Sequence, residues 1–187
     1  MVVVGEIRIA AYLAGGFISA DSHYGPTLRQ LGADGNGHVL VAVMPASGDQ
    51  AGNGDQACDG DQAAKGGQAE TGPARAQQVV GTVMLQTWPH TGQVVAGPDE
   101  AEIRALAVRP EIQGMGIGRT LLRHALRRAA ELGVRQLVLC TEPAMRVAHR
   151  LYEQAGFVRL PERDWTPAPG TTLLVYGLNL DATTQRT

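Results

Sequence analysis

Basic residues, cysteines and long apolar runs are all scarce in this sequence, and each scarcity excludes a class of protein. The chain of 187 residues has 16 Lys and Arg against 18 Asp and Glu, a formal net charge of −2. This balance gives no electrostatic reason to expect nucleic acid or an anionic membrane as a partner. The apolar run from Ile9 to Ala20 is too short to span a bilayer, and Gly15 and Gly16 break it. We expect a cytoplasmic protein with no nucleic-acid or membrane partner.

The cysteines point the same way, because only two occur. Cys58 lies in a low-complexity tract, and Cys140 ends an apolar run that is typical of a buried strand. Their spacing predicts neither a metal site nor a disulfide framework, so we expect no metal and a reducing compartment. We interpret Cys140 as an inert buried thiol rather than a nucleophile.

The size of the chain predicts one domain, residues 1–187, with enough apolar residues for a real core. Residues 46–78 interrupt it, because they hold almost nothing apolar except Ala and repeat a six-residue pattern such as GDQAGN. A parallel β-helix of such repeats would need branched aliphatic residues pointing inward, and a calcium loop would need a fuller ligand pattern. We interpret 46–78 as a flexible insert.

The remaining sequence alternates strand and helix patterns. Seven strands are expected from periodicity and β-branched content: Gly5–Ala10, His38–Val43, Val79–Leu85, Glu102–Val108, Arg135–Thr141, Phe157–Val158 and Leu173–Leu178. Helical patterns cover Tyr12–Ile18, His23–Leu31, Gly116–Leu132 and Ala144–Gln154. The strands on either side of the insert predict an antiparallel hairpin, and the helix from Gly116 joins two strands as a βαβ unit. The expected fold class is α/β with a mixed sheet.

The most informative segment is Gln113 to Thr120, in which three glycines alternate where a helix must begin. A helix start presents unpaired N–H groups and partial positive charge, and glycines let the backbone approach a pyrophosphate closely. A P-loop is excluded because no Gly-Lys-Ser/Thr follows, and the glycine spacing matches a dinucleotide fold poorly. Glycines that only form a turn before a helix remain an alternative.

Two segments together resemble the GNAT acetyltransferases. The strand at Ala101–Pro110 followed by Gln113, Gly116 and Gly118 resembles the family's Q/R-x-x-G-x-G/A motif, and Ala148–Phe157 resembles its A-x-x-x-Y-x-x-x-G-F signature. The resemblance covers roughly residues 79–178 and implies a mixed, mostly antiparallel sheet with a V-shaped splay, flanked by helices. It also implies that acetyl-CoA is the co-substrate. The implied cofactor-binding residues are Leu106, Ala107, Val108, Gln113, Gly114, Met115, Gly116, Ile117, Gly118, Arg119, Thr120 and Ala148.

The resemblance further implies the catalytic residues. Tyr152 stands at the family's general-acid position, and Glu102 matches a glutamate that deprotonates the amine in part of the superfamily. The backbone N–H of Val108 would polarise the thioester carbonyl. Many relatives carry Asn at the position of Met145, so one cofactor contact is absent here. His90 and His149 are interpreted as surface or packing residues, and Asp164, Trp165 and Trp88 as loop residues that could border the acceptor.

These features predict an N-acetyltransferase that joins acetyl-CoA and a primary amine in a ternary complex. A non-catalytic acyl-CoA sensor and a nucleotide-binding α/β protein remain alternatives, and the second signature argues against the latter. The acceptor, the acyl chain preference and the oligomeric state cannot be read from the residues, although dimers are common in this family and a homodimer is compatible with the sequence.

Overall fold

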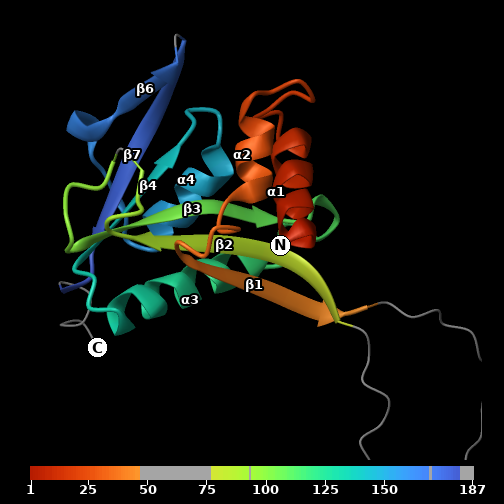
Figure 1. Ribbon diagram of the computed structural model, residues 1–187, viewed down its shortest axis with the longest axis horizontal. Coiled ribbons are helices and arrows are strands. Elements are labelled where there is room, and N and C mark those ends of the chain that lie inside the picture. Colours follow the sequence, from red (N-terminus) through yellow and green to blue (C-terminus); the bar gives the residue numbers. More distant parts are fainter. Residues whose placement is uncertain (47–76, 93, 169, 182–187) are drawn as a thin grey trace, which may run out of the picture.

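A central seven-stranded sheet organises the computed structural model, which describes residues 1–46, 77–92, 94–168 and 170–181 (Figure 1). The strands are β1 (His38–Pro45), β2 (Gln77–Thr87), β3 (Glu100–Val108), β4 (Gln136–Thr141), β5 (Val158–Arg159), β6 (Trp165–Ala168) and β7 (Thr171–Asn179). Their order is β1-β2-β3-β4-β7-β5, with β6 paired to β7. The β3–β4 pair is parallel, and each of the other described pairs is antiparallel. The mixed, mostly antiparallel sheet predicted from the sequence is therefore confirmed.

Helices cover both faces of this sheet (Figure 1). They are α1 (Val2–Ala14), α2 (Tyr24–Gln30), α3 (Ile117–Glu131) and α4 (Arg146–Gln154), with single 3₁₀ turns at Pro110–Ile112 and Pro161–Arg163. The main core lies between the sheet and α3 and α4, where Leu122, Leu139 and Tyr152 are buried together. On the opposite face α1 and α2 bury Ile9 and Leu28 against β2 and β3.

The sheet splits between its two parallel strands. Pairing of β3 with β4 ends at Ile103 and Leu139, so the second half of β3 runs on without β4 beside it. A bulge against β2 coincides with the split, and Ala105 there has a φ of +48°, in the left-handed region that non-glycine residues rarely adopt. Strand residues normally alternate between the two faces of a sheet. The bulge interrupts this alternation, so Ala105 lies on the same face as its neighbour Arg104 and as Glu102. This is the V-shaped splay that the sequence predicts.

The prediction of a strand at Gly5–Ala10 is wrong, because these residues lie inside α1. The apparent alternation comes from Arg8, which reads as a surface residue yet is completely buried. Its Nη1 donates to the carbonyls of Leu28 (3.3 Å) and Leu31 (2.7 Å) at the end of α2, whose last carbonyls have no helical donor. With Arg8 counted as buried, the inward-facing residues of α1 follow helical spacing: Val4, Ile7, Arg8 and Ala11. The burial pattern of this segment therefore depends on tertiary contacts of Arg8.

The other predicted elements have the predicted type, with shifted ends. The helix predicted at Tyr12–Ile18 is only partly present, because Tyr12 lies in the last turn of α1 while Phe17 and Ile18 lie beyond that helix. The second predicted helix is present, since α2 covers most of His23–Leu31. The hairpin across the insert is present, since β1 and β2 pair from His38–Leu85 to Pro45–Gln77. Gln77 and Gln78 belong to β2 rather than to the insert. Residues 47–76 of the predicted insert, with Cys58 and the six-residue repeats, lie outside the described residues.

Candidate active site

A cavity of about 390 Å³ lies in the split between β3 and β4. One wall is the second half of β3, where Ala105, Leu106, Ala107 and Val108 line it; the other wall is α4 with the segment that precedes it. The turn before α3 closes one end. Most of the predicted cofactor-binding residues line this single cavity: Leu106, Ala107, Val108, Gln113, Gly114, Gly116, Ile117, Gly118 and Ala148.

The turn before α3 has the geometry of an anion site. Gly114 and Gly116 have φ values of +86° and +82°, which only glycine adopts without strain. The first intrahelical bond runs from Thr120 N to Gly116 O (3.0 Å), and no side chain caps the helix. The N–H groups from Gly114 to Arg119 are therefore available at the positive end of the helix dipole. A side chain at Gly114 or Gly116 would meet no described atom within 4 Å, so the space in front of this backbone is open.

Tyr152 lies in the deep part of the cavity, on the buried face of α4. The residue is 7% exposed, and its ring packs against Phe157 and Tyr176 with centroids 5.9 and 6.3 Å away. Burial raises the pKa of the phenol, so it stays protonated at neutral pH. No hydrogen-bond partner of its hydroxyl occurs among the described residues, which leaves that O–H available to a ligand in the cavity.

Glu102 does not line the cavity; it lies beside it, on the face of β3 opposite α3. The residue is 5% exposed, and its Oε2 accepts a hydrogen bond from Gly92 N at 2.8 Å. Burial raises the pKa of the carboxyl, against the opposing effects of the Arg104 charge and the Gly92 N–H. A Cβ on Gly92 would lie 2.8 Å from this carboxylate, so a larger residue there would require the Glu102 side chain to move.

Cys140 lines the cavity and is a free thiol. It is the first residue of β4 after the segment that pairs with β3. Burial raises its pKa to about 11, and Trp165 Nε1 donates to its Sγ at 3.3 Å. A thiol with this pKa is almost wholly protonated at neutral pH and is a poor nucleophile. Trp165 was predicted in a loop, but it begins β6 because it pairs with Leu173 of β7.

Three predicted cofactor residues, Met115, Arg119 and Thr120, do not line the cavity. Met115 is 64% exposed, and Arg119 Nη2 donates to Gln154 Oε1 at 2.7 Å across to α4. His149 donates from Nε2 to Glu142 O (3.0 Å) and packs on Tyr176, so its contacts here are those of a packing residue. Sequence reasoning missed the end of α1, where Ala11, Tyr12, Gly15 and Phe17 line the cavity. No motif marks them: Tyr12, Gly15 and Phe17 belong to the segment Tyr12–Ile18, which was expected to be helical, and Ala11 comes just before it.

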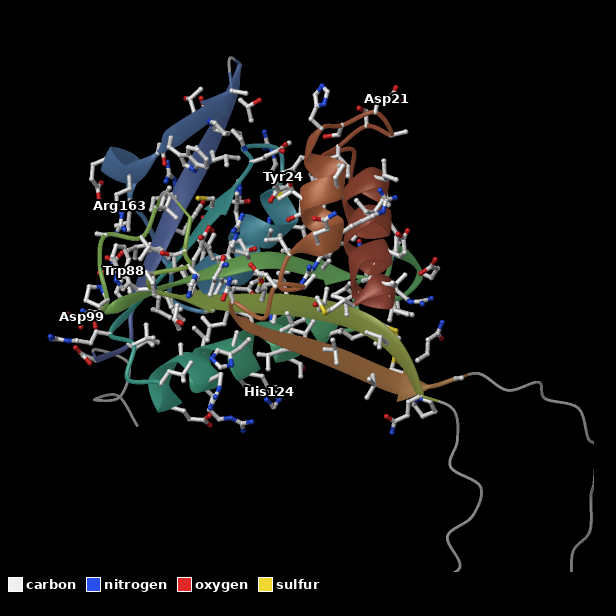
Figure 2. The ribbon with its side chains drawn as sticks, viewed as in Figure 1. Asp21, Tyr24, Trp88, Asp99, His124 and Arg163 are labelled. Carbon is white, nitrogen blue, oxygen red and sulfur yellow. The ribbon has the colours of Figure 1, made fainter. Side chains whose placement is uncertain are left out.

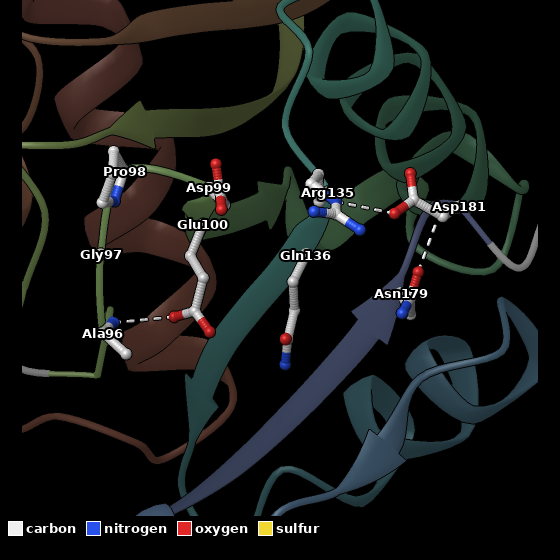
Figure 3. Close-up of a pocket in the computed structure, with 9 residues that line it drawn as sticks. All are labelled: Ala96, Gly97, Pro98, Asp99, Glu100, Arg135, Gln136, Asn179 and Asp181. Atoms are coloured by element: carbon white, nitrogen blue, oxygen red, sulfur yellow. Dashed lines mark hydrogen bonds and ion pairs between the residues drawn. The ribbon is translucent and has the colours of Figure 1, made fainter.

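Other hollows in the described residues lack this chemistry. One of about 380 Å³ lies at the start of β3 and β4, and its polar groups bond to one another: Ala96 N to Glu100 (2.8 Å) and Arg135 to Asp181 (2.9 Å) (Figure 3). Figure 2 places Trp88, Asp99 and Arg163 at this end of the sheet, away from α1. A third, between α3 and α4, lies under the Arg119–Gln154 bond. None of the predicted catalytic residues lines either hollow.

Comparison with known proteins defines the class. The fold matches a GNAT-family acetyltransferase from Staphylococcus aureus Mu50 with a TM-score of 0.62 at 16% identity, over 95% of this chain and 91% of that one. The sequence profile of the acetyltransferase (GNAT) family matches residues 56–157. The chain therefore belongs to the GNAT acetyltransferase family, whose members use acetyl-CoA.

The curated relatives match this chain over a smaller share of its length. The mycothiol acetyltransferase of Cellulomonas flavigena is 32% identical over 109 residues, and that of Sanguibacter keddieii is 44% identical over 62 residues. The matches cover 54% and 33% of this chain but only 31% and 20% of those proteins. The chain thus spans less than a third of the length of these relatives.

Two negative findings apply to the described part of the chain. It holds no helix that is long and apolar enough to cross a membrane. It also holds no cluster of three or more His, Cys, Asp or Glu residues arranged to bind a metal ion.

Proposed function

We propose that this protein is an N-acetyltransferase that moves the acetyl group of acetyl-CoA to a primary amine within a ternary complex. One observation carries the proposal: a single cavity connects the N–H groups at the start of α3 with the hydroxyl of Tyr152. A pyrophosphate at the helix start and a thioester near the tyrosine would be joined by the pantetheine arm through the split. The free thiol Cys140 is compatible with a reducing, cytoplasmic location.

The binding step rests on backbone groups. The pyrophosphate would accept hydrogen bonds from the N–H groups of the segment Gly114–Arg119, with the helix dipole of α3 as the electrostatic partner. Arg119 lies in the first turn and adds positive charge from outside the cavity. The unpaired stretch of β3 at Leu106–Val108 would pair with the amide groups of the pantetheine arm, since β4 has diverged there.

The transfer step joins the amine nitrogen to the thioester carbon and breaks the carbon–sulfur bond. The backbone N–H of Val108 would donate to the carbonyl oxygen as negative charge develops there. The amine gives up one proton, which Glu102 accepts directly or through water. The leaving CoA thiolate gains one proton, which Tyr152 donates, so the products are an amide and free CoA thiol.

Burial raises the pKa of both side chains, and this helps each of them in a different role. A carboxyl whose pKa is raised is a stronger base toward an amine than an exposed carboxylate would be. A buried phenol keeps its proton until a thiolate forms beside it, and the same apolar walls disfavour that thiolate's charge. Tyr152 lines the cavity and Glu102 lies beside it, on the face of β3 opposite α3, so the acid and the base would act from different sides of the thioester.

A calorimetric titration with acetyl-CoA tests the binding half of the proposal. The native protein should bind, and Gly116→Glu should not, because it adds a negative charge and a side chain where φ is +82°. The matched control is Glu131→Gln at the far end of α3, which should bind as the native protein does.

Release of CoA thiol with a panel of primary amines tests the catalytic half. Turnover of any amine supports the transferase. Binding without turnover of any amine would instead support the non-catalytic acyl-CoA sensor, and a folded protein that ignores acetyl-CoA and longer acyl-CoAs would overturn both. The short matches to mycothiol acetyltransferases leave the acceptor open, and a homodimer stays a prediction.

A further inference from the structure

Arg104 occupies the apex of the split on the face of the sheet that α3 does not cover. Ile103 and Leu139 are the last residues at which β3 and β4 pair with each other, so Arg104 and Cys140 are the first residues on each side of the opening. Strand alternation puts Arg104 on the same face as Glu102, because Ala101 and Ile103 pack in the core with α3. In Figure 1, α1 and α2 lie on this face beside β2 and β3, whereas β7 continues the sheet beyond β4 and pairs with β6.

The guanidinium of Arg104 is held in place but incompletely bonded. Its Nη1 donates to Gln86 Oε1 at 3.0 Å, and Gln86 is itself fixed by donating to Asn36 O at 3.2 Å. Its Nε lies 3.7 Å from Glu102 Oε1, which is an ion pair without a hydrogen bond. Within the described residues, neither Nε nor Nη2 has a hydrogen-bond acceptor.

The side chain that carries these unpartnered donors is partly exposed. The side chain of Arg104 is 24% exposed, whereas that of Glu102 is 7% exposed. Arginine presents five N–H groups in a planar fork, and here Nη1 bonds to Gln86 while Nε and Nη2 have no hydrogen-bond acceptor among the described residues. A planar anion is the ligand that such a preset fork recognises best.

Arg104 is also electrostatically close to the cavity wall. After burial, which is the main cause of the raised pKa of the Cys140 thiol, the charges of Glu102 and Arg104 act on it with opposite signs. Both charged groups therefore lie within range of a side chain that lines the proposed thioester site. A ligand that bonds to Arg104 at the apex would present its neighbouring atoms to that site.

We propose that the acceptor is an α-amino acid whose carboxylate binds Arg104 while its amine faces Glu102. The inference rests on the transfer reaction proposed above. Opposite charges 3.7 Å apart are matched by a ligand whose ammonium and carboxylate are joined through one carbon. A polyamine or another purely cationic acceptor would be repelled by Arg104, and an ω-amino acid would separate its two charges too widely.

A purely structural role for Arg104, as the counter-ion of a buried carboxylate, predicts a closer pair. Charge-assisted N–H···O bonds are about 2.7–2.9 Å long. The observed separation is 3.7 Å, and Gln86 and Gly92 take one contact from each partner, so the charge-assisted bonding of Nε is not satisfied by Glu102.

The decisive comparison is between each α-amino acid and its α-carboxamide, measured by CoA thiol release at saturating acetyl-CoA. Amidation removes the carboxylate charge and keeps the amine, whose pKa it lowers, so chemistry alone would favour the amide. Recognition by Arg104 predicts the reverse: an amide KM about 10- to 100-fold higher than that of the best amino acid, with a smaller change in kcat. This arm uses the native protein, so folding of a variant does not affect it.

Variants then assign the effect to Arg104. Arg104→Gln should raise the KM of the amino acid about 10- to 100-fold and leave the KM of its amide within about twofold. Arg104→Lys keeps the charge without the fork and should lie between the two. Arg127→Gln is the matched control and should change neither value, because this exposed arginine bonds to His124 and pairs with Glu131 on the same helix, α3.

The outcomes separate this inference from the transferase proposal. Acetylation of amines regardless of a carboxylate, or an Arg104→Gln effect that is equal for amino acid and amide, overturns the inference and leaves the transferase standing. Turnover confined to amines without a carboxylate does the same. An absence of turnover with all amino acids, amides and simple amines, despite acetyl-CoA binding, overturns both.

Discussion

At the scale of single residues, Tyr152 and Glu102 show how burial assigns acid and base. Both side chains are almost inaccessible, and burial is the first cause of the raised pKa in each. For the phenol a raised pKa retains the proton that the leaving thiolate needs. For the carboxyl it increases affinity for the proton of the amine. The same physical effect thus supports opposite roles, because one group starts protonated and the other ionised.

Tyr152→Phe removes only the hydroxyl and keeps the ring that packs on Phe157. We expect kcat to fall by about 10²-fold or more, with the acetyl-CoA affinity unchanged, because a positioned acid contributes to the transition state. Steady-state kinetics with calorimetry measures both. Tyr176→Phe is the control: its hydroxyl bonds to Glu153 at 3.3 Å outside the cavity, so kcat should hardly change. Equal losses in the two variants would contradict the acid role of Tyr152.

Glu102→Gln should alter stability and activity with opposite sign at high pH. The folded-state pKa of Glu102 is raised, so between the ordinary carboxyl value near 4.5 and that raised value the folded state binds the extra proton. Stability therefore falls as pH rises through this window, and the penalty for the buried charge is complete above it. Gln removes the penalty, so we expect a melting temperature a few degrees higher than native at pH 8 and equal near pH 4. Thermal unfolding monitored by circular dichroism measures this.

The same variant should lose about 10²-fold in kcat/KM, together with the acidic limb of the pH–rate profile. That limb should lie above pH 4.5 in the native protein, since burial raises the pKa of the carboxyl. A native profile that is flat down to pH 4 would show that another group or a water takes the proton.

At the scale of elements, the turn that begins α3 depends on glycines for different reasons. Gly116 needs its left-handed φ of +82°, whereas Gly118 has no such conformation, and a Cβ there would make ordinary contacts with Leu151 at 3.6 Å and Val108 at 3.8 Å. Gly114 resembles Gly116 with a φ of +86°. The motif spacing is therefore a conformational requirement at two positions and only a packing preference at the third.

Gly116→Ala and Gly118→Ala should consequently change stability in opposite directions. The first costs about 1–2 kcal/mol of left-handed strain, and the second gains up to about 1 kcal/mol of helix propensity. In a protein of this size each kcal/mol shifts the melting temperature by about 2–4 °C. Differential scanning calorimetry measures both variants; a lowered melting temperature for Gly118→Ala would mean that Leu151 cannot accommodate the new methyl group.

At the scale of the whole molecule, the site depends on the split sheet and not on the hairpin tip. β1 and β2 are still paired at Pro45 and Gln77, so the ends of the segment between them lie side by side. The cavity is lined by α1, β3, β4, α4 and the turn before α3, and no residue of β1 or β2 takes part. The insert predicted from composition is thus attached to strand ends that do not line the cavity.

Replacing residues 46–76 with an Asn-Gly turn between Pro45 and Gln77 should leave the fold and the acetyl-CoA affinity unchanged. A two-residue connection of this type matches the twist of antiparallel strands, and the shorter loop lowers the closure entropy cost by about 2 kcal/mol. Calorimetric titration and thermal unfolding of the shortened chain test this. A loss of acetyl-CoA binding in a shortened chain that still folds would assign these residues a role in the site.

The sequence by itself determined the strands of the sheet apart from β6, the helices α3 and α4, and the position of the acetyl-CoA turn. Alternating apolar residues, Gly116 and the Tyr152 signature are local patterns, and hydrophobic period and φ preference are properties of neighbouring residues. It failed at Gly5–Ala10, because the burial of Arg8 depends on carbonyls of α2 more than twenty residues away in the chain. Trp165 was misplaced for the same reason, since its strand exists only through pairing with β7.

Only the tertiary structure decided where the strands part and what faces the opening. The end of pairing at Ile103, the bulge at Ala105, the end of α1 in the cavity wall and the incomplete bonding of Arg104 all arise from groups distant in sequence. Burial and hydrogen-bond satisfaction depend on three-dimensional neighbours, so no local pattern encodes them. The family and its co-substrate could thus be predicted from the sequence, whereas the proposed surroundings of the acceptor are defined only by the tertiary structure.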